Sequence, residues 1–201
     1  MTTASEDTHR RIAQAAVRVF LHGGVRTVTG EAVAKMAGVS RMTVYRHFLS
    51  KRDLVRAALN GIANIFRCAL DHQPAEGFAV TMDRLGEAVG SLPVGDLPTR
   101  LAEVRKRYPE LYEEFLVARN RGVGELLQRF FADARASGRL RKDLDRHIVE
   151  AIVREATAGV LASPLLWEKG LGPAELFRTV KETLLYGLLQ RTPGEQESRN
   201  Q

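Results

Sequence analysis

A short stretch between residues 41 and 51 carries the side chains best suited to chemistry, and that chemistry is noncovalent recognition of nucleic acid. An arginine guanidinium can bind guanine O6 and N7 together, and methionine offers apolar contact to the thymine methyl group. The side chains predicted to read base edges are Arg41, Met42 and Arg46. Hydroxyl, imidazole and ammonium groups suit phosphate oxygens. The predicted phosphate contacts are Thr29, Thr43, Tyr45, His47 and Lys51.

Two of these assignments have a plain structural alternative. Tyr45 also fits a half-buried core position, and His47 fits a surface or helix-capping role. Val44 and Phe48, which alternate with the polar residues, are expected to face inward and to lock a small helical core.

Charge is distributed unevenly along the chain. The net charge is +6, and residues 1–52 hold nine Lys or Arg against three acidic residues, whereas the remainder is balanced. A basic first quarter is expected when one module meets a polyanion and the rest of the chain has another task. A solvated basic surface would give the same count.

The elements that position the basic stretch are two short helices. The first helix is predicted to begin after the N-cap Thr29 and to end at Gly38. The second is predicted to begin after the N-cap Ser40 and to run to about His47. A tight turn between two such helices is typical of a helix-turn-helix, which lays its second helix in the DNA major groove. An ordinary helical hairpin has the same spacing.

Longer helices are predicted on both sides of this pair. A helix before it is expected to stop at Gly23 and Gly24, and Ser50 caps a helix expected to reach about Asp71. Further helical windows are predicted at 78–91, 98–107, 109–137, 145–161 and 173–190. No strand pattern competes, so the predicted fold class is all-α.

Catalytic and metal-binding patterns are weak. No two of the five histidines have ligand spacing, and Cys68 has no neighbouring Cys or His. Gly122 and Gly124 lie inside an apolar helical pattern with no strand before them, which argues against a phosphate loop. We therefore expect no catalytic residue, no metal site, no cofactor and no enzyme activity.

The sequence also bears on the cellular compartment. Cys68 cannot pair within the chain, the apolar runs are too short to span a membrane, and the first residues are polar. We expect a cytoplasmic protein with no membrane partner.

Residues 37–54, together with the helix before them, closely resemble the signature of the TetR (tetracycline-repressor-like) family of transcriptional regulators, over roughly residues 8–60. The resemblance implies a three-helix helix-turn-helix DNA-binding domain at 1–52, with a linking helix at about 50–71. It also implies a helical effector-binding and dimerisation domain at 53–201, and a homodimer on operator DNA. Gly30 and Glu31 depart from the family pattern, which often has a threonine or basic residue there, and Glu31 would repel phosphate.

Apolar and aromatic residues after the linking helix can line a pocket for an apolar or amphipathic small molecule, although such residues are more often plain core. The candidate lining residues are Phe66, Phe78, Met82, Leu85, Leu101, Tyr108, Tyr112, Phe115 and Phe130.

Apolar stripes on the last two helical windows can form a four-helix bundle between two protomers, or can close the core of one. Two-fold symmetry favours the bundle, since one recognition helix reads few base pairs and a dimer supplies the second half-site. The candidate interface residues are Ile152, Val153, Ala156, Val160, Phe177, Val180, Leu184 and Leu188.

The function these features predict is a ligand-responsive DNA-binding transcriptional regulator, a repressor that a small effector releases from its operator. An effector-independent architectural DNA-binding protein is the main alternative. A helical enzyme with a basic N-terminal arm is a weaker one.

Overall fold

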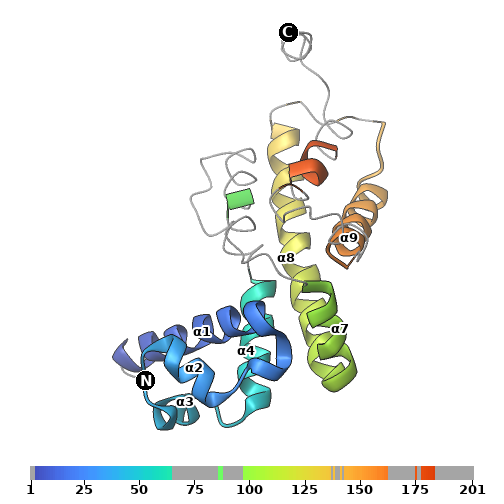
Figure 1. Ribbon diagram of the computed structural model, residues 1–201. Helices are drawn as coiled ribbons and strands as arrows, with labels where there is room; N and C mark the ends of the chain where they lie inside the picture. Colours follow the sequence, from blue (N-terminus) through green and yellow to red (C-terminus); the bar gives the residue numbers. More distant parts are fainter. Residues whose placement is uncertain are drawn as a thin grey trace, which may run out of the picture.

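The structure, a computed structural model, describes residues 3–64, 97–136 and 143–162, short pieces at 86–87, 175 and 178–183, and residues 138 and 141. The regular elements in these ranges are helices, and none is a strand, so the predicted all-α class is confirmed (Figure 1). The helices are α1 (Thr3–Thr27), α2 (Gly30–Ala37), α3 (Arg41–His47), α4 (Lys51–Ala63), α7 (Leu97–Arg107), α8 (Pro109–Ala136) and α9 (Arg146–Ala162).

The three predicted N-caps are confirmed. The Thr29 hydroxyl accepts the Ala32 N–H at 3.1 Å, and the Ser40 hydroxyl accepts the Thr43 N–H at 3.0 Å. Ser50 accepts the Asp53 N–H at 3.2 Å. Each bond satisfies an amide that the first helical turn leaves without a partner.

The turn between α2 and α3 depends on Gly38. Its φ of 65° and ψ of 40° are left-handed, and its N–H donates to the carbonyls of Ala34 and Lys35. A side chain is strained in this conformation, whereas glycine adopts it freely. The turn therefore sets the angle between the two short helices.

The first helix differs slightly from its prediction. Its helical backbone breaks at Gly24, as expected, but helical residues resume and α1 ends at Thr27. The Thr27 hydroxyl donates to the carbonyls of Val19 and Gly24, which ties the last turn back to the helix.

The C-terminal helices match their predicted windows closely where the structure describes them. Helix α8 covers 109–136 and α9 covers 146–162, and the Asp145 carboxylate accepts the His147 and Ile148 N–H groups to cap α9. The predicted extension of α4 to about Asp71 and most of the windows at 78–91 and 173–190 lie outside the described residues.

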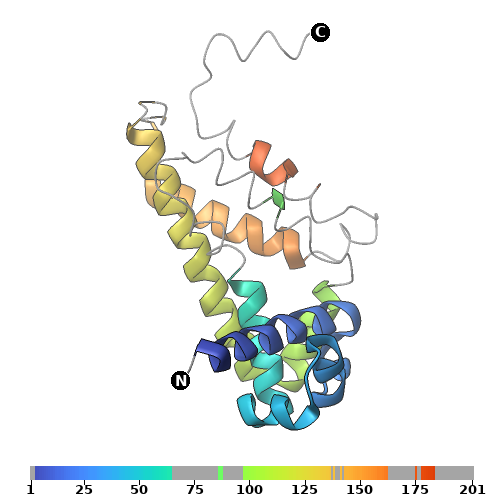
Figure 2. The same ribbon diagram turned by 90° about the vertical axis from the view of Figure 1, so that its left-hand side faces the viewer.

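Buried apolar side chains form two clusters. The larger joins α1–α4 to α7 and to the first turns of α8, and Phe20, Leu54 and Val104 are each 0% exposed within it. The smaller lies between the second half of α8 and α9. Figures 1 and 2 show α8 running from the N-terminal helices to α9, so this one helix belongs to both clusters.

Within the described ranges, we find no helix whose length and hydropathy would let it cross a bilayer.

We predict that Gly38→Ala lowers the free energy of unfolding by about 1 kcal/mol, because alanine is strained at a left-handed position. Gly38→Asn should lose less, since asparagine tolerates this conformation better. Urea denaturation of the three proteins measures the difference. An alanine variant as stable as the parent would contradict the role given to this turn.

Candidate nucleic-acid interface

Helix α3 presents one face outward and one inward. Arg41 and Arg46 are exposed, and Met42 is 83% exposed, whereas Val44 is buried at 0%. Phe48, which follows the helix, is also buried. The three residues predicted to read base edges thus share the solvent side of one short helix, and the two predicted core residues are confirmed.

Tyr45 lies between these two faces. Its ring is half-buried and packs over the first residue of α2, and a Cβ at Gly30 would come within 2.6 Å of the ring and its hydroxyl oxygen. The Arg41 guanidinium carbon Cζ lies 5.5 Å from the ring centroid, within cation–π range. Because Gly30, which departs from the family pattern, has no side chain, it leaves room for the Tyr45 ring at this position.

The hydroxyl groups near this tyrosine are already engaged in caps. Thr29 accepts the Ala32 N–H, and the hydroxyls of Thr43 and Ser40 are 2.9 Å apart. A hydroxyl that accepts from an amide can still donate its own proton. Thr29 caps α2 and the Tyr45 hydroxyl lies beside Gly30, the first residue of that helix, so both hydroxyls are at an N-terminus whose dipole and free amides favour an anion.

His47 belongs to a small ring cluster that also includes His9 from α1. The His9 ring stacks on Phe48 with 4.5 Å between centroids, and it is 5.8 Å from the His47 ring. Partial burial, followed by the positive charges of Arg46 and His9, lowers the pKa of His47 below its ordinary value. Near neutral pH the free protein therefore holds His47 mainly as the neutral imidazole.

Lys51 opens α4 and is held by the end of α1. Its Nζ donates to the Arg26 carbonyl oxygen at 2.9 Å. Burial and then the positive charge of Arg107 lower the pKa of Lys51. One of its three N–H donors is used internally, which leaves two for an external acceptor.

Two further residues position the interface and were not singled out by sequence spacing. Arg11 donates from Nη2 to the Ala37 carbonyl at 2.8 Å and so fastens α1 to the end of α2. His9 supports Phe48 by stacking. Neither carries a local signal, because each acts on a helix that is distant in the sequence.

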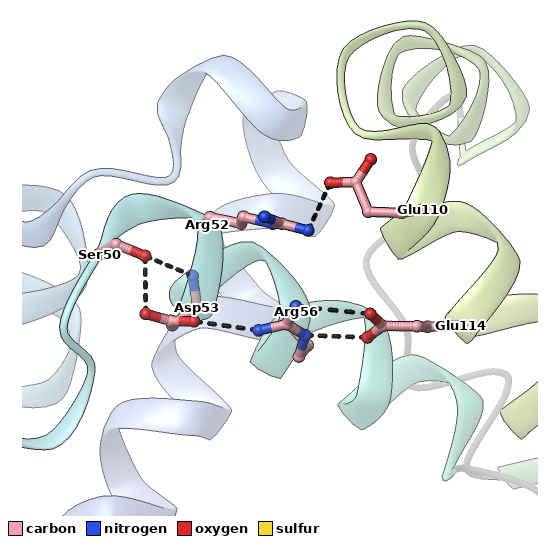
Figure 3. Close-up of polar contacts among 6 residues, drawn as sticks. All are labelled: Ser50, Arg52, Asp53, Arg56, Glu110 and Glu114. Carbon is pink, nitrogen blue, oxygen red and sulfur yellow. Dashed lines mark hydrogen bonds and ion pairs between the residues drawn. The ribbon is translucent and has the colours of Figure 1, made fainter.

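Ion pairs join α4 to α8 (Figure 3). Arg52 contacts Glu110 at 2.8 Å, and one turn later Arg56 donates to both carboxylate oxygens of Glu114, at 2.8 and 3.4 Å. Arg56 also donates to Asp53 at 3.0 Å. The hydrogen bond that Arg56 donates to Glu114 raises the pKa of Arg56, so the pair stays charged. Asp53, whose N–H is capped by Ser50, is thus connected to α8 through Arg56.

The predicted effector-lining residues separate into groups. Leu101, Tyr108 and Tyr112 are half-buried against the larger core cluster and Phe115 is buried inside it, whereas Phe130 lies in the smaller cluster. The others, Phe66, Phe78, Met82 and Leu85, lie outside the described residues. The structure thus brings together four of the nine predicted residues.

The predicted dimer residues also divide. Ile152 is 55% exposed on α9, next to Ile148 at 62%, whereas Val153 is 6% exposed and packs against α8. Val153 is thus a core residue of its own protomer. Ala156 and Val180 are half-buried, and Val160 belongs to α9. Phe177, Leu184 and Leu188 lie outside the described residues.

A groove of about 430 Å³ opens between α1 and α4, beside the histidine pair. Its apolar wall includes Ala13, Val17 and Ala57, and none of the predicted effector-lining residues contributes to it. In the part of the chain that the structure describes, no three His, Cys, Asp or Glu side chains gather as metal ligands.

The chain is similar in sequence to known transcriptional regulators. Residues 12–58 match the family model described as bacterial regulatory proteins, tetR family. The HTH-type transcriptional regulator UidR of Escherichia coli (strain K12) is 26% identical over 168 residues, which cover 81% of this chain and 84% of UidR.

Solved structures share the fold. NalD, the secondary repressor of the MexAB-OprM multidrug efflux pump in Pseudomonas aeruginosa, is 26% identical with a TM-score of 0.54, over 95% of this chain and 100% of NalD. A protein from Saccharomonospora viridis in complex with choline is 20% identical with a TM-score of 0.58, over 92% of this chain and all (100%) of that one.

We predict that Gly30→Ala and Tyr45→Ala are strongly non-additive. Gly30→Ala alone should cost about 1–3 kcal/mol of unfolding free energy, because the new methyl group collides with the ring. In a Tyr45→Ala background the same change should be neutral or stabilising, since alanine is the better helix former. A double-mutant cycle by urea denaturation measures this, and costs that add within about 0.5 kcal/mol would show that the ring does not press on Gly30.

Proposed function

Since this chain belongs to the TetR family of bacterial transcriptional regulators, we propose that it is a repressor that binds operator DNA as a homodimer and leaves it when a small apolar or amphipathic effector binds. The observation that carries the DNA-binding part is the outward face of α3. Arg41, Met42 and Arg46 are exposed there, while Val44 anchors the opposite face in the core. Since operator DNA lies in the bacterial cytoplasm, the proposed repressor acts there.

The base-reading residues have the reach and chemistry for the major groove. Arg41 and Arg46 can each bind guanine O6 and N7, and Met42 can contact a thymine methyl group. The Tyr45 ring beneath Arg41 limits the directions in which that guanidinium can point. A side chain restrained before binding loses less conformational entropy when it binds.

Phosphate contacts surround this helix. Thr29 caps α2 and Tyr45 lies beside its first residue, Thr43 lies in the first turn of α3, and Lys51 opens α4. His47 adds a group that gains a positive charge when it takes up a proton, and a nearby phosphate would raise its pKa again. These contacts fix the register of the protein on the duplex and carry little sequence information.

The dimer is supported by the exposed side of α9. Ile148 and Ile152, one turn apart, are 62% and 55% exposed, while Val149 and Val153 face the protomer's own core. A second copy related by a two-fold axis would bury both isoleucines. Two recognition helices could then enter successive major grooves about 34–36 Å apart.

The effector part of the proposal is supported by the packing around α7 and α8. Leu101, Tyr108 and Tyr112 are partly buried against the cluster that also holds the N-terminal helices together. NalD is a repressor, and the Saccharomonospora protein binds choline within the same fold. A molecule inserted beside these residues would displace α7 or α8 relative to α4, and the two recognition helices would lose their alignment.

Two measurements test this function. Selection of bound fragments from genomic DNA with the purified protein should enrich a two-fold symmetric sequence. A small-molecule screen should then find compounds that raise the melting temperature and release that sequence. Compounds that stabilise the protein without release, or none at all, would favour an architectural protein.

We predict different losses for Arg41→Ala and Lys51→Ala. Lys51→Ala should weaken binding about equally on all duplexes and reduce the salt slope by about one unit, because it removes a phosphate contact. Arg41→Ala should relax discrimination at particular bases, at a cost of about 1–3 kcal/mol on the selected operator. Competition binding across single-base operator variants at several salt concentrations separates the two. Identical profiles would contradict the division between base and phosphate contacts.

We predict that Glu114→Gln weakens the link between effector and DNA. Loss of the charged pair with Arg56 should change stability by less than about 1 kcal/mol, because exposed ion pairs contribute little. It should nevertheless reduce the ratio of operator affinities measured without and with a compound from the screen. Glu113→Gln removes the same charge from an exposed neighbour and is the matched control. An unchanged ratio in Glu114→Gln would exclude this route.

A further inference from the structure

Two histidines from different helices meet at one edge of the DNA-binding module. His9 lies on α1 and His47 ends α3, and their ring centroids are 5.8 Å apart. Figure 1 shows the beginning of α1 close to the two short helices. The His9 ring also stacks on Phe48, with 4.5 Å between centroids and 19° between the ring planes. His9 is exposed, so the stack holds its ring in place while the ring stays open to an external group.

The histidine pair borders the face that is proposed to contact DNA. Arg46, the residue before His47, is exposed on the outward side of α3. Arg11 donates to the Ala37 carbonyl at 2.8 Å, which fastens the beginning of α1 to the end of α2 independently of the rings. Since the two rings are neighbours, a phosphate group that contacts His47 would also lie within reach of His9.

The groove beside the pair brings charged groups from α1 and α4. Both histidines line it, together with Arg10, Asp53 and Arg56. The Asp53 carboxylate already accepts the Ser50 hydroxyl at 2.6 Å and the Arg56 guanidinium at 3.0 Å. The one acidic residue that we find in the described lining of the groove is therefore engaged within α4 and its cap.

The remaining charges around the pair do not stabilise a proton on it. Glu6 precedes His9 on α1, but within the described ranges no ion pair involves either histidine. Partial burial of His47, followed by the positive charges of Arg46 and His9, lowers the pKa of His47. A phosphate group would act in the opposite direction, because a nearby negative charge favours the protonated imidazole.

We propose that His9 and His47 together bind one phosphate group of the operator, and that the pair takes up a proton from the solvent when it does. His9 thereby becomes a DNA contact that comes from α1, outside α2 and α3. The proposal rests on the proposed operator binding and adds to it one contact residue and a dependence on pH. Affinity for DNA should rise as the pH falls from about 8 to about 6, the range in which histidine titrates.

The direction of this pH effect separates binding from folding. A histidine whose pKa is lowered in the folded protein, as that of His47 is, makes the fold less stable when the pH falls through its ordinary value of about 6.5. Binding has the opposite sign, because the complex holds the added proton more tightly than the free protein does. A rise in affinity at low pH therefore cannot result from a more stable fold.

The test compares His9→Phe, His47→Gln and the double variant with the parent. Phenylalanine keeps a ring on Phe48 but cannot take up a proton. His22→Gln is the matched control, because it removes an exposed histidine of the same helix whose Nδ1 lies 2.7 Å from the Arg18 carbonyl oxygen. Far-UV circular dichroism and melting temperature at each pH confirm that the variants are folded. The probes are a fixed non-specific duplex and the fragment selected from genomic DNA.

Salt dependence at two pH values measures the added charge directly. In the parent, the slope of log affinity against log salt concentration should be steeper at about pH 6 than at about pH 8, by about one unit per protomer. The double variant should have the same slope at both pH values. Each single variant should bind about tenfold more weakly than the parent at the lower pH, because it lacks one donor to the phosphate. His22→Gln should behave as the parent does.

Three results would overturn the paired site and leave the proposed function standing, provided that operator selection is intact. The first is parent-like binding by folded His9→Phe at the lower pH, which would leave His9 with packing alone. The second is a parent slope that does not change with pH, and the third is a double variant that keeps the parent's change in slope. A parent that selects no sequence at all would overturn the proposed function as well.

Discussion

The apolar core that joins α1 and α4 to α7 and to the first turns of α8 is the constraint on which the rest of the structure depends. Val104 and Leu111 are buried in the same cluster as Phe20 and Leu54, so the N-terminal helices share their core with the helices that follow. Packed cores resist continuous deformation and move between discrete arrangements. A displacement of α8 must therefore carry α4 with it or open this core.

Polar contacts at the same junction have a different task. The pairs Arg52–Glu110 and Arg56–Glu114 are roughly half-exposed, and exposed pairs contribute only about 0–1 kcal/mol each. Burying one large apolar side chain contributes about 1.5–3 kcal/mol. The core thus supplies the strength of the junction. The ion pairs, spaced one turn apart on both helices, select one register of α4 along α8.

The sequence could predict features that depend on neighbours in the chain. The cap at Ser40 and the turn at Gly38 follow from residue types within a few positions, and both are confirmed. The contact of Gly30 with Tyr45 could not be predicted, because it requires the angle between α2 and α3. The effect of the Arg107 charge on the pKa of Lys51 had no local signal either, since 56 positions separate the two residues in the sequence. Site residues held by caps were accessible to prediction, and those held by packing between helices were not.

The apolar positions of α9 show why a stripe alone leaves the partner undecided. Ile148, Val149, Ile152 and Val153 form pairs of adjacent apolar residues repeated after one turn, which makes the apolar sector wider than one neighbouring helix can cover. Packing against α8 takes Val149 and Val153 and leaves the isoleucines exposed. The protomer core therefore accounts for one side of this helix, and the exposed side is the one that the proposed dimer would use. When the apolar sector of a helix is wider than one neighbouring helix can cover, the sequence itself indicates a second packing partner.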